Sequence, residues 1–92
     1  MPKPMHVLWL RPEDYPRFRA IFDDVDDTFE QWRTRMERKL VELAKQGIEI
    51  ERMLIDPDAL VAWCAANGRK VDAQARALYP AFLALERDRR DR

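Results

Sequence analysis

The sequence predicts an α+β protein, with a small α/β arrangement as the alternative, built as a single domain over residues 1–92. Its length lies within the range of one domain, and 47% hydrophobic residues argue for a folded chain although 37% are charged. Apolar residues form two short runs suited to strands, and elsewhere recur at the spacing of three and four that is typical of helices. We therefore expect the order β-α-α-β-α-α, with two short strands and about four helices.

The N-terminal part begins with an expected extended lead, residues 1–4, because its prolines disfavour a helix. Residues 5–10 (MHVLWL) predict a strand that is apolar on both faces and ends at Arg11-Pro12. Beyond this point apolar side chains recur with helical spacing as far as Val25, where an acidic segment interrupts the pattern. Because both faces of the strand are apolar, we expect other elements to cover both.

A long second helix carries the strongest pattern in the chain. Thr28 and Gln31 have the spacing of a capping box, with Asp27 and Glu30 as the alternative register. An apolar stripe with spacings of three and four follows, and Gly47 supplies the left-handed residue that commonly ends a helix.

Residues 48–55 (IEIERMLI) predict the second strand, with Ile48, Ile50 and Leu54 facing inward. The connection between the strands is long enough for a parallel crossover, and the sequence does not choose between parallel and antiparallel pairing. Two strands alone are marginal, so the helices or a second copy of the chain must cover or extend the sheet.

Two further helices complete the prediction. The Asp56-Pro57 pair suits the N-cap and first position of one helix, which ends at Asn67-Gly68. Asp72 caps the last helix, and Pro80 within it should either kink or split it. Residues 86–92 (ERDRRDR) carry no apolar side chain and are expected to fray as a charged tail.

The acidic segment Asp23–Asp27 is the most conspicuous chemical feature. With Glu30 it offers carboxylates to a cation such as Mg²⁺ or Ca²⁺, but the EF-hand spacing fails because Phe29 stands where that loop needs glycine. Carboxylates before a helix also cap its free N–H groups and complement its positive end. We favour this capping role and expect no metal site, although the sequence leaves cation binding by the segment open.

The single histidine, His6, and the single cysteine, Cys64, belong to no recognisable catalytic set. One cysteine cannot form an internal disulfide, and Cys64 follows Trp63 in an apolar helix, where a free thiol is most often buried. We therefore predict a core thiol, no catalytic residue and no cofactor.

The chain has 17 basic and 17 acidic residues and a formal charge of zero, which argues against a globally basic nucleic-acid binder. A local basic face remains as the candidate for nucleic-acid contact, and acidic neighbours dilute it. The candidate interaction surface that the sequence suggests consists of Arg69, Lys70, Arg76 and Tyr79.

Residues 55–79 read Ile-Asp-Pro-Asp-Ala-Leu-Val-Ala-Trp-Cys-Ala-Ala-Asn-Gly, then Asp72, Ala75-Arg76 and Tyr79. This stretch resembles the C-terminal half of small bacterial proteins of unknown function, in which a strand leads into a Pro-capped helix with a Trp-Cys pair. The Thr-Phe-Glu-Gln-Trp helix start is similar too, so the resemblance covers mainly residues 28–79. It implies a bacterial, cytosolic origin and no assigned activity, so no catalytic residue is carried over.

The leading hypothesis is therefore a small bacterial, cytoplasmic protein that acts as a non-enzymatic protein-interaction module. The alternatives are a small nucleic-acid-associated protein and, less favoured, a carboxylate-based divalent-metal enzyme. We expect an unidentified protein partner, with a homodimer that joins two sheets as one form of it. We expect no membrane association, because no apolar run approaches the roughly 20 residues of a spanning helix.

Overall fold

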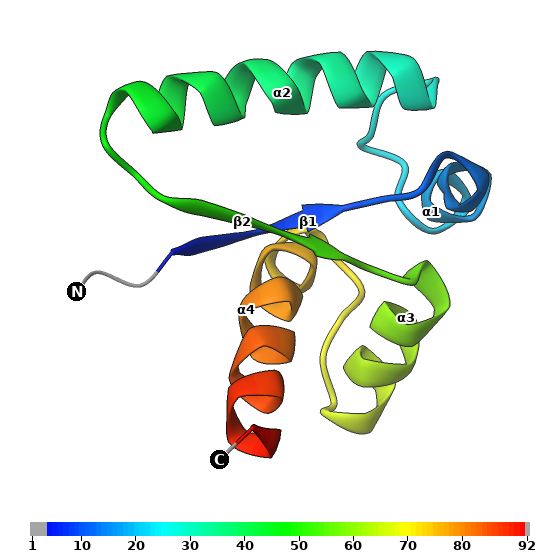
Figure 1. Ribbon diagram of the computed structural model, residues 1–92. Helices are drawn as coiled ribbons and strands as arrows, with labels where there is room; N and C mark the ends of the chain where they lie inside the picture. The colour runs from blue at the N-terminus through cyan, green and yellow to red at the C-terminus, as the bar shows by residue number, and fades with distance from the viewer. Residues whose placement is uncertain (1–3, 92) are drawn as a thin grey trace.

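The structure, a computed structural model, describes residues 4–91. Its elements are β1 (Met5–Trp9), a 3₁₀ turn (Pro12–Asp14), α1 (Tyr15–Ile21), α2 (Phe29–Lys45), β2 (Ile50–Leu54), α3 (Pro57–Ala66) and α4 (Ala73–Arg90). The predicted order and the α+β class are confirmed (Figure 1). The expected extended lead, residues 1–4, lies outside the described residues apart from Pro4.

The two strands pair in parallel, from Met5 opposite Ile50 to Trp9 opposite Leu54. A parallel pair needs a long crossover, and here α1 and α2 provide it. The crossover helix α2 lies over one face of the sheet and runs antiparallel to β1, while α3 and α4 lie on the other side (Figure 1). Trp9 faces α2, where its ring lies 5.1 Å from that of Trp32.

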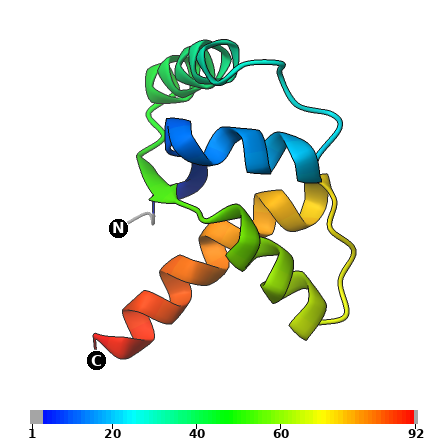
Figure 2. The same ribbon diagram turned by 90° about the vertical axis from the view of Figure 1, so that its right-hand side faces the viewer.

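The short helix α1 lies at the end of the sheet where β1 finishes, at a level between α2 and α3 (Figure 2). Its Tyr15 ring lies 5.9 Å from Phe29 and 6.1 Å from Trp32, so α1 is joined to the first turns of α2 by aromatic contacts. Phe18 is buried on the same helix, 4.9 Å from Phe22. These aromatic contacts hold α1, the first helix after β1, against the start of α2.

One hydrophobic core joins all four helices to the sheet. Cys64 is fully buried within it, as predicted for a core thiol, and burial raises the pKa of that thiol. The buried members of the core are Leu8, Leu10, Tyr15, Phe18, Phe22, Trp32, Ile55, Leu60, Cys64, Ala75 and Tyr79.

The predicted helix ends are confirmed by side-chain caps. Thr28 and Gln31 form the reciprocal capping box at the start of α2, so the alternative register that begins at Asp27 is not used. Asp56 and Asp72 accept from backbone N–H groups at the starts of α3 and α4. Gly47 has a φ of +80° directly after α2, a conformation that favours glycine.

The predicted inward face of the second strand is wrong at Leu54, which is 58% exposed. Met53 and Ile55 point the other way and pack into the core instead. The reason is that α3 and α4 both cover the Met53 and Ile55 side of the sheet. The Leu54 side is left to α2 alone, and Trp9 and Arg52 cover part of that side with a cation–π contact at 4.1 Å.

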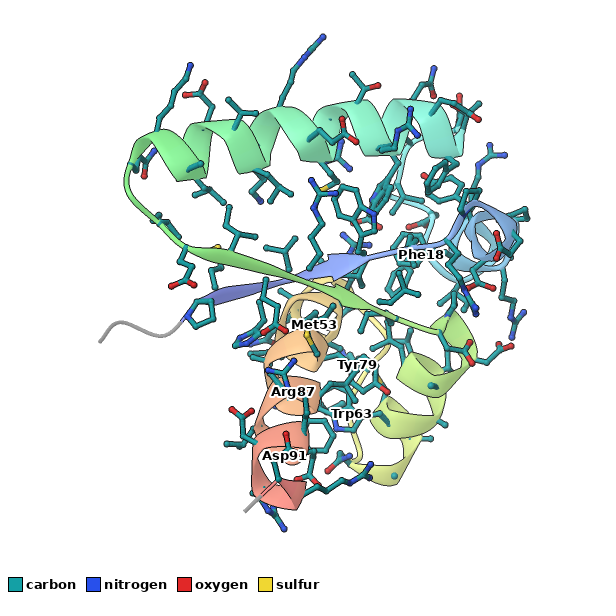
Figure 3. The ribbon with its side chains drawn as sticks, viewed as in Figure 1. Phe18, Met53, Trp63, Tyr79, Arg87 and Asp91 are labelled. Atoms are coloured by element: carbon teal, nitrogen blue, oxygen red, sulfur yellow. The ribbon has the colours of Figure 1, made fainter. Side chains whose placement is uncertain are left out.

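Helix α4 is continuous across Pro80, so the proline does not split it. Of the segment 86–92, expected to fray, residues 86–90 are helical, and Arg92 lies outside the described residues. Arg87 holds this end to the sheet, because its Nη2 donates to Glu51 Oε1 at 3.1 Å and it lies beside Met53 (Figure 3). The bond to Arg87 also lowers the pKa of Glu51. This ion pair joins the sheet to a turn of α4 that has no apolar side chain of its own.

Candidate functional site

A groove of about 620 Å³ lies beside β1. All residues from Met5 to Leu8 line it, whereas none of its lining residues in the described chain comes from β2. Successive side chains of a strand point to opposite faces, so a hollow that reaches all of them follows the edge of the strand. The groove, called the β1 groove below, thus follows the edge of β1 that faces away from β2.

The other walls of the β1 groove come from α1, α2, α4 and the loop between α1 and α2. The lining residues outside the strand are Phe18, Asp24, Val25, Asp26, Trp32, Arg35, Met36, Lys39, Leu43, Ala73, Arg76 and Ala77. They combine apolar side chains with charged ones, a mixture that is usual in a binding site.

The backbone of β1 is unpaired along this groove. Met5 N–H donates to the Glu49 carbonyl at 2.8 Å and Ile55 N–H donates to the Trp9 carbonyl at 2.9 Å, so these residues of β1 face β2. In a parallel pair, every second residue of a strand directs its N–H and C=O groups toward the partner strand. The residues between them direct both groups toward the opposite edge of the strand. The N–H and C=O groups of His6 and Leu8 therefore face the β1 groove, and no hydrogen bond reaches them from other residues of the described chain.

An arginine from α4, Arg76, also lines the groove. Arg76 donates from Nη1 and Nη2 to the two carboxylate oxygens of Asp24, at 2.9 and 3.0 Å. This paired hydrogen bond lowers the pKa of Asp24. The Arg76 guanidinium also lies 4.7 Å from the centre of the Phe22 ring. It thereby ties the loop before α2 to the first turns of α4.

Asp26 and Asp27 of the acidic segment make similar ion pairs. Asp26 accepts from Arg35 of α2 at 2.9 Å, and its backbone carbonyl accepts from the Tyr15 hydroxyl. Asp27 accepts from Arg19 of α1 at 3.1 Å. The hypothesis that these carboxylates cap α2 is therefore corrected: Thr28 is the cap, and the aspartates join neighbouring elements. Within residues 4–91 no group of three or more His, Cys, Asp or Glu side chains is placed to hold a metal ion.

Lys39 leaves the groove with a positive charge. It lines the groove from α2, and no carboxylate of residues 4–91 forms an ion pair with it. Arg35 and Arg76, which also line the groove, each form an ion pair with an aspartate. His6 also lines the groove, and its Nε2 lies 3.1 Å from Glu51 Oε1. Lys39 therefore offers an anionic group a positive charge that has no ion-pair partner within residues 4–91.

The structure does not bring the four residues of the sequence-derived surface together. Tyr79 is buried, with its ring 5.1 Å from that of Trp63 (Figure 3), so it is not a surface residue. Arg69 lies 5.5 Å from the Trp63 ring and Lys70 is exposed in the loop before α4. Only Arg76 lines the β1 groove.

Sequence reasoning missed the groove that brings Met36, Lys39 and the free edge of β1 together, although it expected that edge to be covered or paired. Met36 has the spacing of a core residue, and Lys39 looks like any solvated charge on a helix. The one available signal was the strand itself, which is apolar on both faces and therefore an unsuitable exposed edge.

The single cysteine and the single histidine lie in different surroundings. Cys64 is buried in α3 and is not among the lining residues, whereas the Nε2 atom of His6 lies beside Glu51.

No helix within the described residues is long and apolar enough to cross a membrane. No family model, curated protein or solved structure matches the chain.

Proposed function

We propose that this protein is a non-enzymatic protein-interaction module, cytoplasmic in setting, that receives its partner in the β1 groove. The observation that carries the proposal is the combination of apolar lining residues with an unpaired strand edge in one groove. Unpaired backbone groups beside apolar side chains are what a protein segment can satisfy, because it offers both backbone hydrogen bonds and side chains.

The charges of the groove support a protein partner over nucleic acid. Nucleic-acid binding draws on several cations that are free to contact phosphates. Here Arg35 and Arg76, the two arginines that line the groove, are paired with aspartates, so Lys39 is the one lysine or arginine of its lining that has no ion pair within the described residues. The same pairs occupy Asp24 and Asp26, which the carboxylate-enzyme alternative would need as free ligands.

A blocking substitution on α4 tests the proposal. Ala77 lines the groove and is exposed, so Ala77→Trp fills the groove without removing a core side chain. Ala81 is exposed one turn later and does not line the groove, so Ala81→Trp is the matched control. Peptides selected on the wild-type protein from a random-peptide display library are then measured against both variants by fluorescence polarisation.

We expect Ala77→Trp to weaken binding of the selected peptides by at least about tenfold, since it occupies the volume they need. Ala81→Trp should change their affinity by less than about twofold. Equal binding to both variants, or no peptide selected above background, would contradict the proposal.

A further inference from the structure

We infer that the occupant of the β1 groove is an extended segment of another protein, added as a third strand to β1 and carrying an acidic side chain opposite Lys39. This inference rests on the proposed function, because it names the conformation and charge of the partner that the same groove receives.

The strand conformation follows from the backbone of β1. His6 and Leu8 present their N–H and C=O groups along the groove, and an extended chain satisfies alternate groups of a strand edge at the usual spacing of about 4.8 Å. A helix has already used its backbone groups internally and cannot do this. The groove therefore matches the form of recognition in which a peptide extends a sheet.

The walls set which side chains the added strand carries. Side chains of a strand alternate between its faces, so those on one face meet α2 and those on the other meet the start of α4. On the α2 side lie Met36 and the uncompensated Lys39, which fit an apolar and an acidic side chain. On the α4 side lie Ala73 and Ala77, whose small side chains leave space for a larger apolar group.

A second copy of this chain fits the groove less well than a single segment. Its own β1 is flanked by α2 and α4, and those helices would have to approach the same walls. A segment without flanking helices meets no such obstacle. A homodimer in which two copies pair through their β1 strands is therefore the competing outcome. The mass of the protein in solution distinguishes this dimer from a monomer that binds a partner segment.

The first experiment tests the charge. Acidic peptides from the random-peptide display selection should bind Lys39→Glu at least about tenfold more weakly than wild type, because the substitution places like charges together. Arg38→Glu is the control, because it reverses a positive charge at the preceding residue, which is exposed and does not line the groove. It should alter the affinity for the peptides by less than about twofold. Equal losses in the two variants would overturn the assignment of Lys39.

The second experiment tests the strand. In the presence of a selected peptide, amide hydrogen exchange of His6 and Leu8 should slow by about tenfold or more. The amide of Arg52 is the control, because it faces the outer edge of β2 and should not change. An added strand donates only alternate N–H groups to β1. N-methylation of the peptide amides that face β1 should therefore abolish binding, whereas N-methylation of the amides between them should not.

The outcomes separate this inference from the proposed function. Suppose that Ala77→Trp prevents the peptides from binding, but that the peptides leave amide hydrogen exchange at His6 and Leu8 of the wild type unchanged. This result would support the interaction module and overturn the added strand. Peptides unaffected by Ala77→Trp would overturn both. A light-scattering mass near twice 11.0 kDa that returns to the monomer value in Ala77→Trp would replace the partner segment by a second copy.

Discussion

At the scale of single residues, Arg76 shows how one long side chain connects distant parts of the chain. It reaches from α4 to Asp24, 52 positions earlier, and only 21% of its side chain is exposed. Its guanidinium satisfies both oxygens of one carboxylate while lying against the Phe22 ring. The strength of this contact depends on the ionisation of Asp24, which makes it accessible to a pH experiment.

The Asp24→Asn variant tests that dependence. Because Arg76 lowers the pKa of Asp24 in the folded state, the ion pair stabilises the protein above the unfolded pKa of 3.8. This contribution is lost as the pH falls through the lower folded-state pKa. We expect wild type to exceed the variant in free energy of unfolding at neutral pH, and the difference to shrink below about pH 4.

Urea unfolding at a series of pH values measures this difference. Asp23→Asn is the control, because Asp23 forms no ion pair within the described residues. A difference between wild type and Asp24→Asn that stays constant into acid would show that the ion pair contributes nothing to stability.

At the scale of elements, the start of α2 is determined locally. Thr28 and Gln31 exchange hydrogen bonds over a separation of three residues, so the cap needs no distant partner. Asp27 precedes it but is 80% exposed and pairs with Arg19. The stability of the helix start should therefore depend on the threonine hydroxyl and hardly on the aspartate.

We expect Thr28→Ala to lower the free energy of unfolding by about 1 kcal/mol, the usual loss on removing a threonine N-cap. Thr34→Ala makes the same change at an exposed position inside α2 and should be neutral or slightly stabilising. Chemical denaturation followed by circular dichroism compares them. Equal losses in both variants would show that the capping box does not hold the helix start.

The same local character explains what the sequence could predict. Asp56, Asp72 and Gly47 mark helix ends through contacts within a few residues, and all three assignments are confirmed. The direction of the sheet and the exposed face of Leu54 depend on where α3 and α4 pack, which no local pattern contains. The groove lay beyond sequence reasoning for the same reason, because Asp24 and Arg76 come together only in the folded chain.

At the scale of the whole molecule, the core is one connected unit. Leu60 and Cys64 of α3 are fully buried and pack in the same cluster as Leu8 of β1 and Tyr79 of α4. A thiol in this position is covered by a cluster that the helices and the sheet build together, so we expect it to react mainly when that packing is lost. Its reactivity therefore reports on unfolding of the domain.

Cys64 should react slowly with a thiol reagent in native buffer and rapidly in denaturant, because burial both covers the sulfur and raises its pKa. Leu60→Ala, expected to cost about 2–5 kcal/mol, should speed native labelling. Leu85→Ala is the control, since Leu85 is 55% exposed. Rapid stoichiometric labelling of the folded wild type would refute the core position of the thiol.

The parallel pairing of Met5 with Ile50 also affects how the protein is made. Because β2 follows α1 and α2 in the chain, the apolar strand β1 has no partner until the ribosome has synthesised the whole crossover. At about 5–20 residues per second this interval lasts several seconds, whereas helices form within microseconds. We therefore expect β1 to be exposed as an unpaired apolar segment during translation, and α2, which forms before β2 emerges, to be able to cover one of its faces at this stage.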